Sequence, residues 1–284
     1  VEAAPPGRRG LYLALQYATQ DFAVMVAGVV GFTLSALLAP ADLDAWGWRA
    51  AFLIGAAIVP FGLLMRRALP ETHRGRDPAA PTARARAPVR IVALGLAIFA
   101  AGMIANYTLD YVTTYAQDSL KLAASVAFGA TIVLGMVSVA CDLICGALAD
   151  KLGRKPVMLT AGVALILLTV PGYMLMIRFP GVATVYAVTA VLGGLLSLMT
   201  GPGLIIVTES LPRAVRSGAL GTVYAFAVAG FGGTTQFVIK WLSGATHSAL
   251  APAWYMTAAL VVGAGAMALM RETAPIKTGV TEDI

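Results

Sequence analysis

Polar side chains recur at helical spacing inside segments of the sequence that are otherwise apolar. Gln16 and Gln20 are four residues apart, which places them on one face of a helix, and Asp21 follows directly. A second set combines amide, hydroxyl and carboxyl groups on neighbouring faces of one helix: Asn106, Tyr107, Asp110, Tyr111 and Thr114. Such groups are costly inside a membrane and are usually functional. They predict a path for a polar metabolite or a proton; for the tyrosines, a place at the membrane interface is the alternative.

Composition indicates which elements must position these side chains. The chain has 284 residues, of which 59% are hydrophobic and 12% are charged. A soluble domain is nearer half apolar and a quarter charged. Most segments are apolar all round, whereas a large soluble helical enzyme would show amphipathic stripes. A membrane barrel would show alternation in segments of about ten residues. The sequence therefore predicts an all-α membrane protein.

Turn-like or charged separators divide the chain into eight predicted transmembrane helices, each with about the 20 residues needed to cross a bilayer. The predicted spans are 11–38, 48–66, 91–115, 123–147, 157–177, 182–207, 217–243 and 253–270. The Arg-, Pro- and Ala-rich segment 67–90 is the longest separator and predicts a linker between two helix bundles. We expect residues 1–66 to end one bundle, residues 91–270 to form the other, and residues 271–284 to form a tail.

Basic residues collect on one side of this arrangement. Sixteen of the 20 Lys and Arg residues fall before span 1, after span 8, or in every second connection, and only Arg49, Lys121, Arg178 and Lys240 fall on the alternate side. Because basic residues gather on the cytoplasmic side, we expect cytoplasmic termini, a cytoplasmic 67–90 linker and a location in the cell's inner membrane. The net charge of +6 is explained by this asymmetry, so we expect no nucleic-acid partner.

Two pairs of segments repeat about 200 residues apart. "EAAPPGRRG" precedes span 1 and "ESLPRAVRSG" precedes span 7, while "RRALPETHRG" follows span 2 and "LMRETAPIKTG" follows span 8. Spans 1 and 2 therefore correspond to spans 7 and 8. Spans 3 to 6 have no counterpart, so the repeat predicts two halves of six helices, with roughly 120 further residues upstream. The repeat therefore predicts that this chain is a fragment of a longer transporter.

The connection between spans 4 and 5 carries the most specific motif. It runs from Gly146 through Asp150 and Lys151 to Gly153, Arg154 and Lys155. This stretch resembles the inter-helix signature of the major facilitator superfamily, G-x-x-x-D-[RK]-x-G-[RK]-[RK]. The resemblance implies a fold of two six-helix bundles, and a charge network that gates the cytoplasmic side. The alternative is a basic turn that only obeys the positive-inside rule.

Acidic and basic residues of the repeats are candidates for the same gate network. Glu2 with Arg9, and Glu209 with Arg216, are seven residues apart where one helix ends and the next begins. Each pair could close across its turn or join the Asp150 loop, and simple anchoring at the interface is the alternative. Asp142, two turns before Asp150, is a further candidate member.

The sequences of three other segments resemble the metabolite:proton symporter branch of that superfamily. These are "EAAPPGRRGLYLALQ", "WGWRAAFLIGAAIVP" and "RRALPET". The resemblance implies symport of protons with a small polar metabolite, most like the citrate and tricarboxylate carriers. Asp110 departs from the branch, and no Lys or Arg stands at mid-span for a carboxylate. Alternatives are an exporter or a sugar or betaine carrier, and more distantly a membrane enzyme or receptor. We expect a monomer in the bilayer, with no cofactor and no metal.

Overall fold

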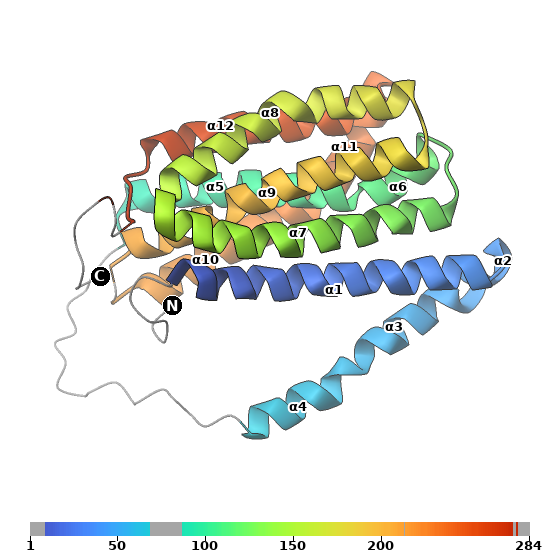
Figure 1. Cartoon of the computed structure of the whole chain (residues 1–284), viewed down its shortest axis with the longest axis horizontal. Helices are drawn as coiled ribbons and strands as arrows, with labels where there is room; N and C mark the ends of the chain where they lie inside the picture. The colour runs from blue at the N-terminus through green and yellow to red at the C-terminus, as the bar shows by residue number, and fades with distance from the viewer. Residues whose placement is uncertain (1–8, 69–86, 213, 275–276, 278–284) are drawn as a thin grey trace.

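The computed structural model describes residues 9–68, 87–212, 214–274 and 277 (Figure 1). Every regular element in these ranges is helical. In chain order the elements are α1 (Arg9–Leu37), α2 (Pro40–Asp42), the π-helix η1 (Leu43–Gly47), α3 (Trp48–Ala56), α4 (Ile58–Ala68), α5 (Val89–Asp110), α6 (Val112–Asp118), α7 (Ala124–Leu152), α8 (Arg154–Arg178), α9 (Val182–Ser210), α10 (Arg216–Phe226), the π-helix η2 (Ala227–Gly232), α11 (Gly233–Thr246) and α12 (Ala251–Leu269).

Eight stretches in the described part of the chain are long and apolar enough to cross a membrane, which confirms the predicted all-α membrane class. Several bounds differ from the predicted spans, most of all in the second stretch. The second begins at Pro40, because a proline at the first helical position starts α2 and the chain continues through η1 into α3. The third is followed by α6, which carries the helical path to Asp118.

Helix α9 forms the centre of the bundle. It packs against α7, α8 and α5, while α12 lies against both α5 and α8. Two thirds of the most apolar window of α9 are buried inside the molecule, compared with about a third of the corresponding window of α8. Side chains of α9 that point towards its neighbours include the fully buried Leu192 and Ile206. The polar residues Thr189, Ser197, Thr208 and Glu209 of α9 are buried as well.

Helix α1 lies along α7 over most of its length (Figure 1). Glycines permit this close approach. A Cβ atom at Gly28 would lie 2.8 Å from the backbone nitrogen of Ile132, and one at Gly135 would lie 2.6 Å from that of Met25. Small residues at such contacts let membrane helices pack backbone to backbone. The seam between α1 and α7 therefore joins the first described helix to the helices packed around α9.

Helices α3 and α4 diverge from the rest of the molecule (Figure 1). None of the most apolar window of this stretch is buried inside the molecule. Its large side chains are exposed, with Phe52 at 74% and Ile58 at 69%. A helix that is apolar all round and unburied by its own chain is suited to lipid or to further transmembrane helices.

Candidate functional site

The predicted motif forms the turn between α7 and α8 at one end of the molecule. Gly153 separates the two helices with φ 103° and ψ 155°, a conformation that is essentially restricted to glycine. The preceding helix thus ends at Leu152 and the next begins at Arg154. Gly153 permits the tight turn that the sequence predicted.

The carboxylate of Glu272, which follows α12, caps the first turn of α8. Its Oε1 atom accepts hydrogen bonds from the backbone nitrogen atoms of Arg154, at 3.1 Å, and of Thr273 and Ala274, both at 2.9 Å. Its Oε2 atom accepts one from the nitrogen of Lys155 at 3.0 Å. Partial burial opposes ionisation of this carboxyl, but the four N–H donors outweigh it and lower its pKa. Glu272 therefore ties the end of α12 to the motif.

Arg154 is the buried centre of the charged cluster. Its side chain is 2% exposed, and its Nη2 atom lies 3.5 Å from Asp150 Oδ1 and 3.3 Å from Glu209 Oε1. Its Nε and Nη1 atoms, and Glu209 Oε2, have no hydrogen-bond partner in the described part of the chain. We call Asp150, Arg154, Glu209 and Glu272 the motif cluster. It joins α7, α8, α9 and the residues after α12.

The remaining predicted gate residues have other surroundings. The Nζ atom of Lys155 donates to the carbonyl oxygens of Ala268 and Met270 at the end of α12, and Lys151 is exposed. Of the two pairings left open for Glu209, the structure contains the one with the motif. Arg216 instead donates from Nε to Leu211 O at 3.1 Å. Glu2, together with the side chain of Arg9, lies outside the described residues.

A polar pocket lies midway along the helices, between α1, α5, α7 and α9. Its lining contains four of the predicted path residues, namely Gln20, Asp21, Asn106 and Asp110. It also contains Tyr17, Val24, Gly102, Met103, Leu134, Ser138, Leu196, Ser197 and Thr200, and we call it the central pocket. The space between these atoms, its open mouth included, is about 540 Å³. None of these lining residues is Lys or Arg.

Two of the pocket residues are already paired. Asn106 Nδ2 donates to Asp110 Oδ2 at 3.3 Å, one turn further along α5. This contact follows from the four-residue spacing in the sequence. Ser138 of α7 and Ser197 and Thr200 of α9 add hydroxyl groups that the sequence analysis did not single out. Serine and threonine are common in membrane helices, so only the folded arrangement distinguishes these three.

Four predicted path residues lie outside the central pocket. Gln16 is exposed, although it shares a helix face with Gln20. Tyr107 points towards η2, where a Cβ atom at Gly232 would lie 2.8 Å from its ring. Tyr111 is buried directly after the last residue of α5, and Thr114 on α6 is exposed. Successive residues of a helix turn by about 100°, so a run of polar residues cannot face one pocket.

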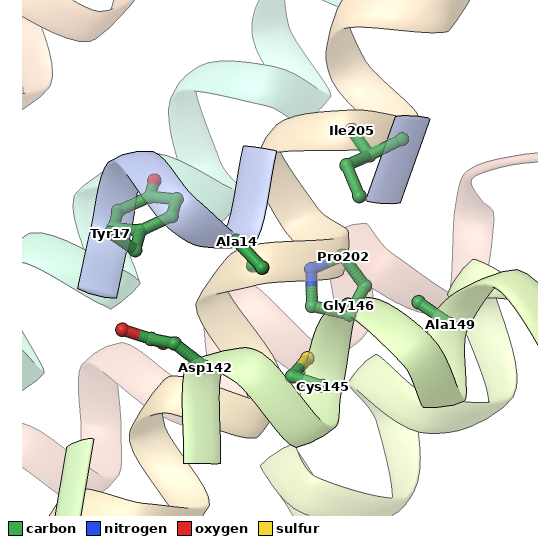
Figure 2. Close-up of a pocket in the computed structure, with 9 residues that line it drawn as sticks. Ala14, Tyr17, Asp142, Cys145, Gly146, Ala149, Pro202 and Ile205 are labelled. Atoms are coloured by element: carbon green, nitrogen blue, oxygen red, sulfur yellow. The ribbon is translucent and has the colours of Figure 1, made fainter. Parts of the chain in front are cut away.

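Asp142, a candidate for the gate network, lines a second pocket away from the motif cluster. Eight residues along a helix correspond to about 12 Å, which separates Asp142 from Asp150. We call this second pocket the seam pocket, and Figure 2 shows Asp142 beside Tyr17 at one side of it. The lining residues are Ala14, Tyr17, Asp142, Cys145, Gly146, Ala149, Gly201, Pro202 and Ile205. Gly146, the first residue of the motif, therefore faces the seam between α1, α7 and α9.

Comparisons with known proteins agree with this architecture. The family model described as Major Facilitator Superfamily matches residues 1–171. The chain is 30% identical over 271 residues to the citrate-proton symporter of Klebsiella pneumoniae, covering 92% of this chain and 61% of that protein. It is 32% identical over 269 residues to the alpha-ketoglutarate permease of Escherichia coli (strain K12), with the same two coverages.

The chain is also similar to a transporter whose name gives substrates other than citrate or alpha-ketoglutarate. The glycine betaine/proline/ectoine/pipecolic acid transporter OusA of Dickeya dadantii (strain 3937) is 28% identical over 300 residues, covering 97% of this chain and 59% of that protein. The chain thus spans about three fifths of the length of these curated relatives, all of which are transporters rather than enzymes. The family match, the helical architecture and the α7–α8 motif agree, and the chain belongs to the Major Facilitator Superfamily.

Proposed function

We propose that the full-length protein is a proton-coupled symporter of a small polar metabolite, most like citrate or a dicarboxylate, that works by alternating access. The observation that carries this proposal is the central pocket, where four helices place amide, hydroxyl and carboxyl groups around one space. The names of the citrate-proton symporter and the alpha-ketoglutarate permease support the substrate class and the coupling ion.

The arrangement of the helices supports a division into two bundles. We propose that α1 to α4 end the first bundle, that 67–90 links the bundles, and that α5 to α12 form the second. In the described part of the chain, the basic residues at the motif end include Arg90, Lys151, Lys155 and Arg271. The positive-inside rule supports placing this end on the cytoplasmic side of the inner membrane. We propose a monomer.

The motif cluster is proposed to act as the cytoplasmic gate. Its ion pairs connect α7, α8 and α9, so a relative movement of these helices must exchange their partners. Arg154 has two nitrogen atoms without a partner in the described part of the chain, which are available for a different pairing in a second state. A buried pair with alternative partners is suited to bias two conformations.

A betaine-type substrate is the second candidate, and the charge of the central pocket favours it. Asp21 and Asp110 line the pocket with Tyr17, whereas no described lining residue is cationic. Carboxylates and an aromatic face suit a quaternary ammonium group. A carboxylate substrate would be held by neutral donors such as Asn106 and Ser197, or by a cation from helices outside this chain.

Transport in liposomes distinguishes the two candidates. The full-length protein is reconstituted, an inward proton gradient is imposed, and uptake of labelled citrate or labelled glycine betaine is followed with and without a protonophore. The proposal predicts citrate accumulation that the protonophore abolishes. Accumulation of betaine alone would support the second candidate, and no gradient-dependent uptake of either would contradict both.

A further inference from the structure

Asp142 is a buried carboxyl group that faces no cation in the described part of the chain. Its residue is 2% exposed, although it is ionisable and lies in the middle of α7. Its Oδ2 atom meets no hydrogen-bond donor in the described part of the chain. A buried carboxylate oxygen without a donor is costly, whereas a protonated carboxyl group carries no net charge.

Asp21 brings a second carboxyl group to the same place from α1. The backbones touch there, because a Cβ atom at Gly135 of α7 would lie 2.7 Å from the carbonyl oxygen of Asp21. The side chain of Asp21 interacts directly with that of Asp142, and Ser197 of α9 also reaches it. Two ionised carboxylates this close repel each other, and a shared proton removes the repulsion.

No cation in the described residues faces this pair. The titratable groups around it are Tyr17 on α1, Asp110 on α5, Cys141 and Cys145 on α7, and Tyr224 on α10. The polar side chains that α9 contributes to the two adjoining pockets are the hydroxyl groups of Ser197 and Thr200. A neutral ring of tyrosine and thiol groups cannot neutralise a carboxylate, and a third carboxyl group adds to the repulsion. A proton is thus the species that can relieve this charge.

We propose that the Asp21–Asp142 pair is the binding site of the transported proton, and that its protonation holds α1 against α7. The inference rests on the proposed proton-coupled transport. A proton from water forms an O–H bond with one carboxylate, and the pair passes from two negative charges to one. Loss of that proton to the other side of the membrane restores both charges and drives the two helices apart.

The position of the pair links this step to the substrate and to the gate. Asp21 lines the central pocket, Asp142 lines the seam pocket, and Tyr17 lines both. The seam pocket continues along α7 through Gly146 and Ala149 towards the motif cluster. The proton site therefore lies between the substrate site and the motif end, at the seam that must open when the bundles move apart.

Distance measurements with spin labels test the proposal without a substrate. In the full-length protein, with Cys141 and Cys145 changed to alanine, labels are placed at the exposed positions Tyr12 on α1 and Leu152 at the end of α7. Distances are measured at about pH 5.5 and about pH 8.5, so that the proton concentration differs by about a thousandfold. We expect a short distance at low pH and a longer one at high pH.

The double variant Asp21→Asn with Asp142→Asn mimics the neutral pair and should keep the short distance at both pH values. Asp118→Asn, an exposed acid on α6, is the matched control and should respond to pH like the parent protein. A parent distance that ignores pH, or a double variant that still responds, would overturn the proposal. So would loss of the response in Asp110→Asn with both members of the pair intact.

Liposome assays of the same variants separate this inference from the proposed function. Asp142→Asn should reduce proton-driven citrate accumulation by about tenfold, while citrate exchange without a gradient stays within about twofold. Equal loss of both would contradict a coupling role. If no proton-driven citrate uptake occurs in the parent protein but the label distance follows pH, the symport proposal fails together with the transport role of the pair, and only the proton-dependent contact between α1 and α7 stands.

Discussion

Replacing Gly153 by alanine tests how strongly the motif turn depends on its geometry. The backbone at this position has φ 103° and ψ 155°, and holding a residue with a Cβ atom there costs about 1–3 kcal/mol. The new Cβ atom would also lie 2.7 Å from Glu272 Oε2, so the carboxylate must move away from the first turn of α8. Loss of a helix cap costs about 1 kcal/mol.

The two effects together lower the free energy of unfolding by about 2–4 kcal/mol. Because 1 kcal/mol shifts the melting midpoint of a domain of this size class by about 2–4 °C, Gly153→Ala should lower the midpoint by at least about 4 °C. The measurement is thermal unfolding of the full-length protein in detergent, followed by intrinsic fluorescence.

Gly181→Ala is the matched control at the opposite end of α8. Gly181 precedes α9 with φ −169°, an extended conformation open to any residue, and a Cβ atom there would meet nothing within 4 Å. Alanine at such a position is neutral or stabilises by about 0.4–1 kcal/mol through the unfolded state. Equal midpoints for the two variants would refute the account of the turn.

Further predictions concern the Glu272 cap, the contact between Asp118 and Lys240, the seam between α1 and α7, and the proposed gate. Because the pKa of Glu272 is lowered, its stabilisation is complete above its unfolded pKa of about 4.3 and is lost as pH falls through the lower folded value; Glu272→Gln should flatten this acid-side loss of melting midpoint. Asp118→Asn removes the exposed contact with Lys240, 3.1 Å long, and should leave midpoint and uptake unchanged, while a marked loss of either would contradict a surface role. Gly28→Val forces α1 away from the α7 backbone and should lower the midpoint by several degrees in the same melt; an unchanged midpoint would deny the close contact. Asp150→Asn should reduce proton-driven uptake with normal membrane insertion, and full uptake rates in that variant would refute the gate proposal.

The spans were predictable because local composition determines them. An apolar run of about 20 residues needs no distant partner to be recognised, and all eight predicted spans coincide with helices of the structure. The conformation of Gly153 was also predictable, since a short turn between two spans requires a residue free of a Cβ atom. Helix boundaries differ from the predicted ones where a proline starts a helix early and a π-helix continues it, as at Pro40 and η1.

Contacts between distant segments were harder to predict. Glu272 caps α8 from 118 residues away, and its only sequence signal was that Glu272-Thr273 repeats Glu71-Thr72. Asp142 was grouped with Asp150 because both are acidic and close in sequence, although two helical turns separate them. In contrast, Asp21 and Asp110 stood out in the sequence because each interrupts an apolar span, and both line the central pocket.

Proton movement on addition of substrate tests the central claim most directly. The full-length protein is sealed in liposomes with a trapped pH-sensitive dye, and citrate, 2-oxoglutarate, glycine betaine and shikimate are added outside one at a time. The account predicts that citrate or 2-oxoglutarate acidifies the lumen, and that Asp142→Asn removes the acidification. If none of the four compounds acidifies the lumen, in vesicles shown to be sealed and loaded, the result would contradict proton symport and favour an exporter.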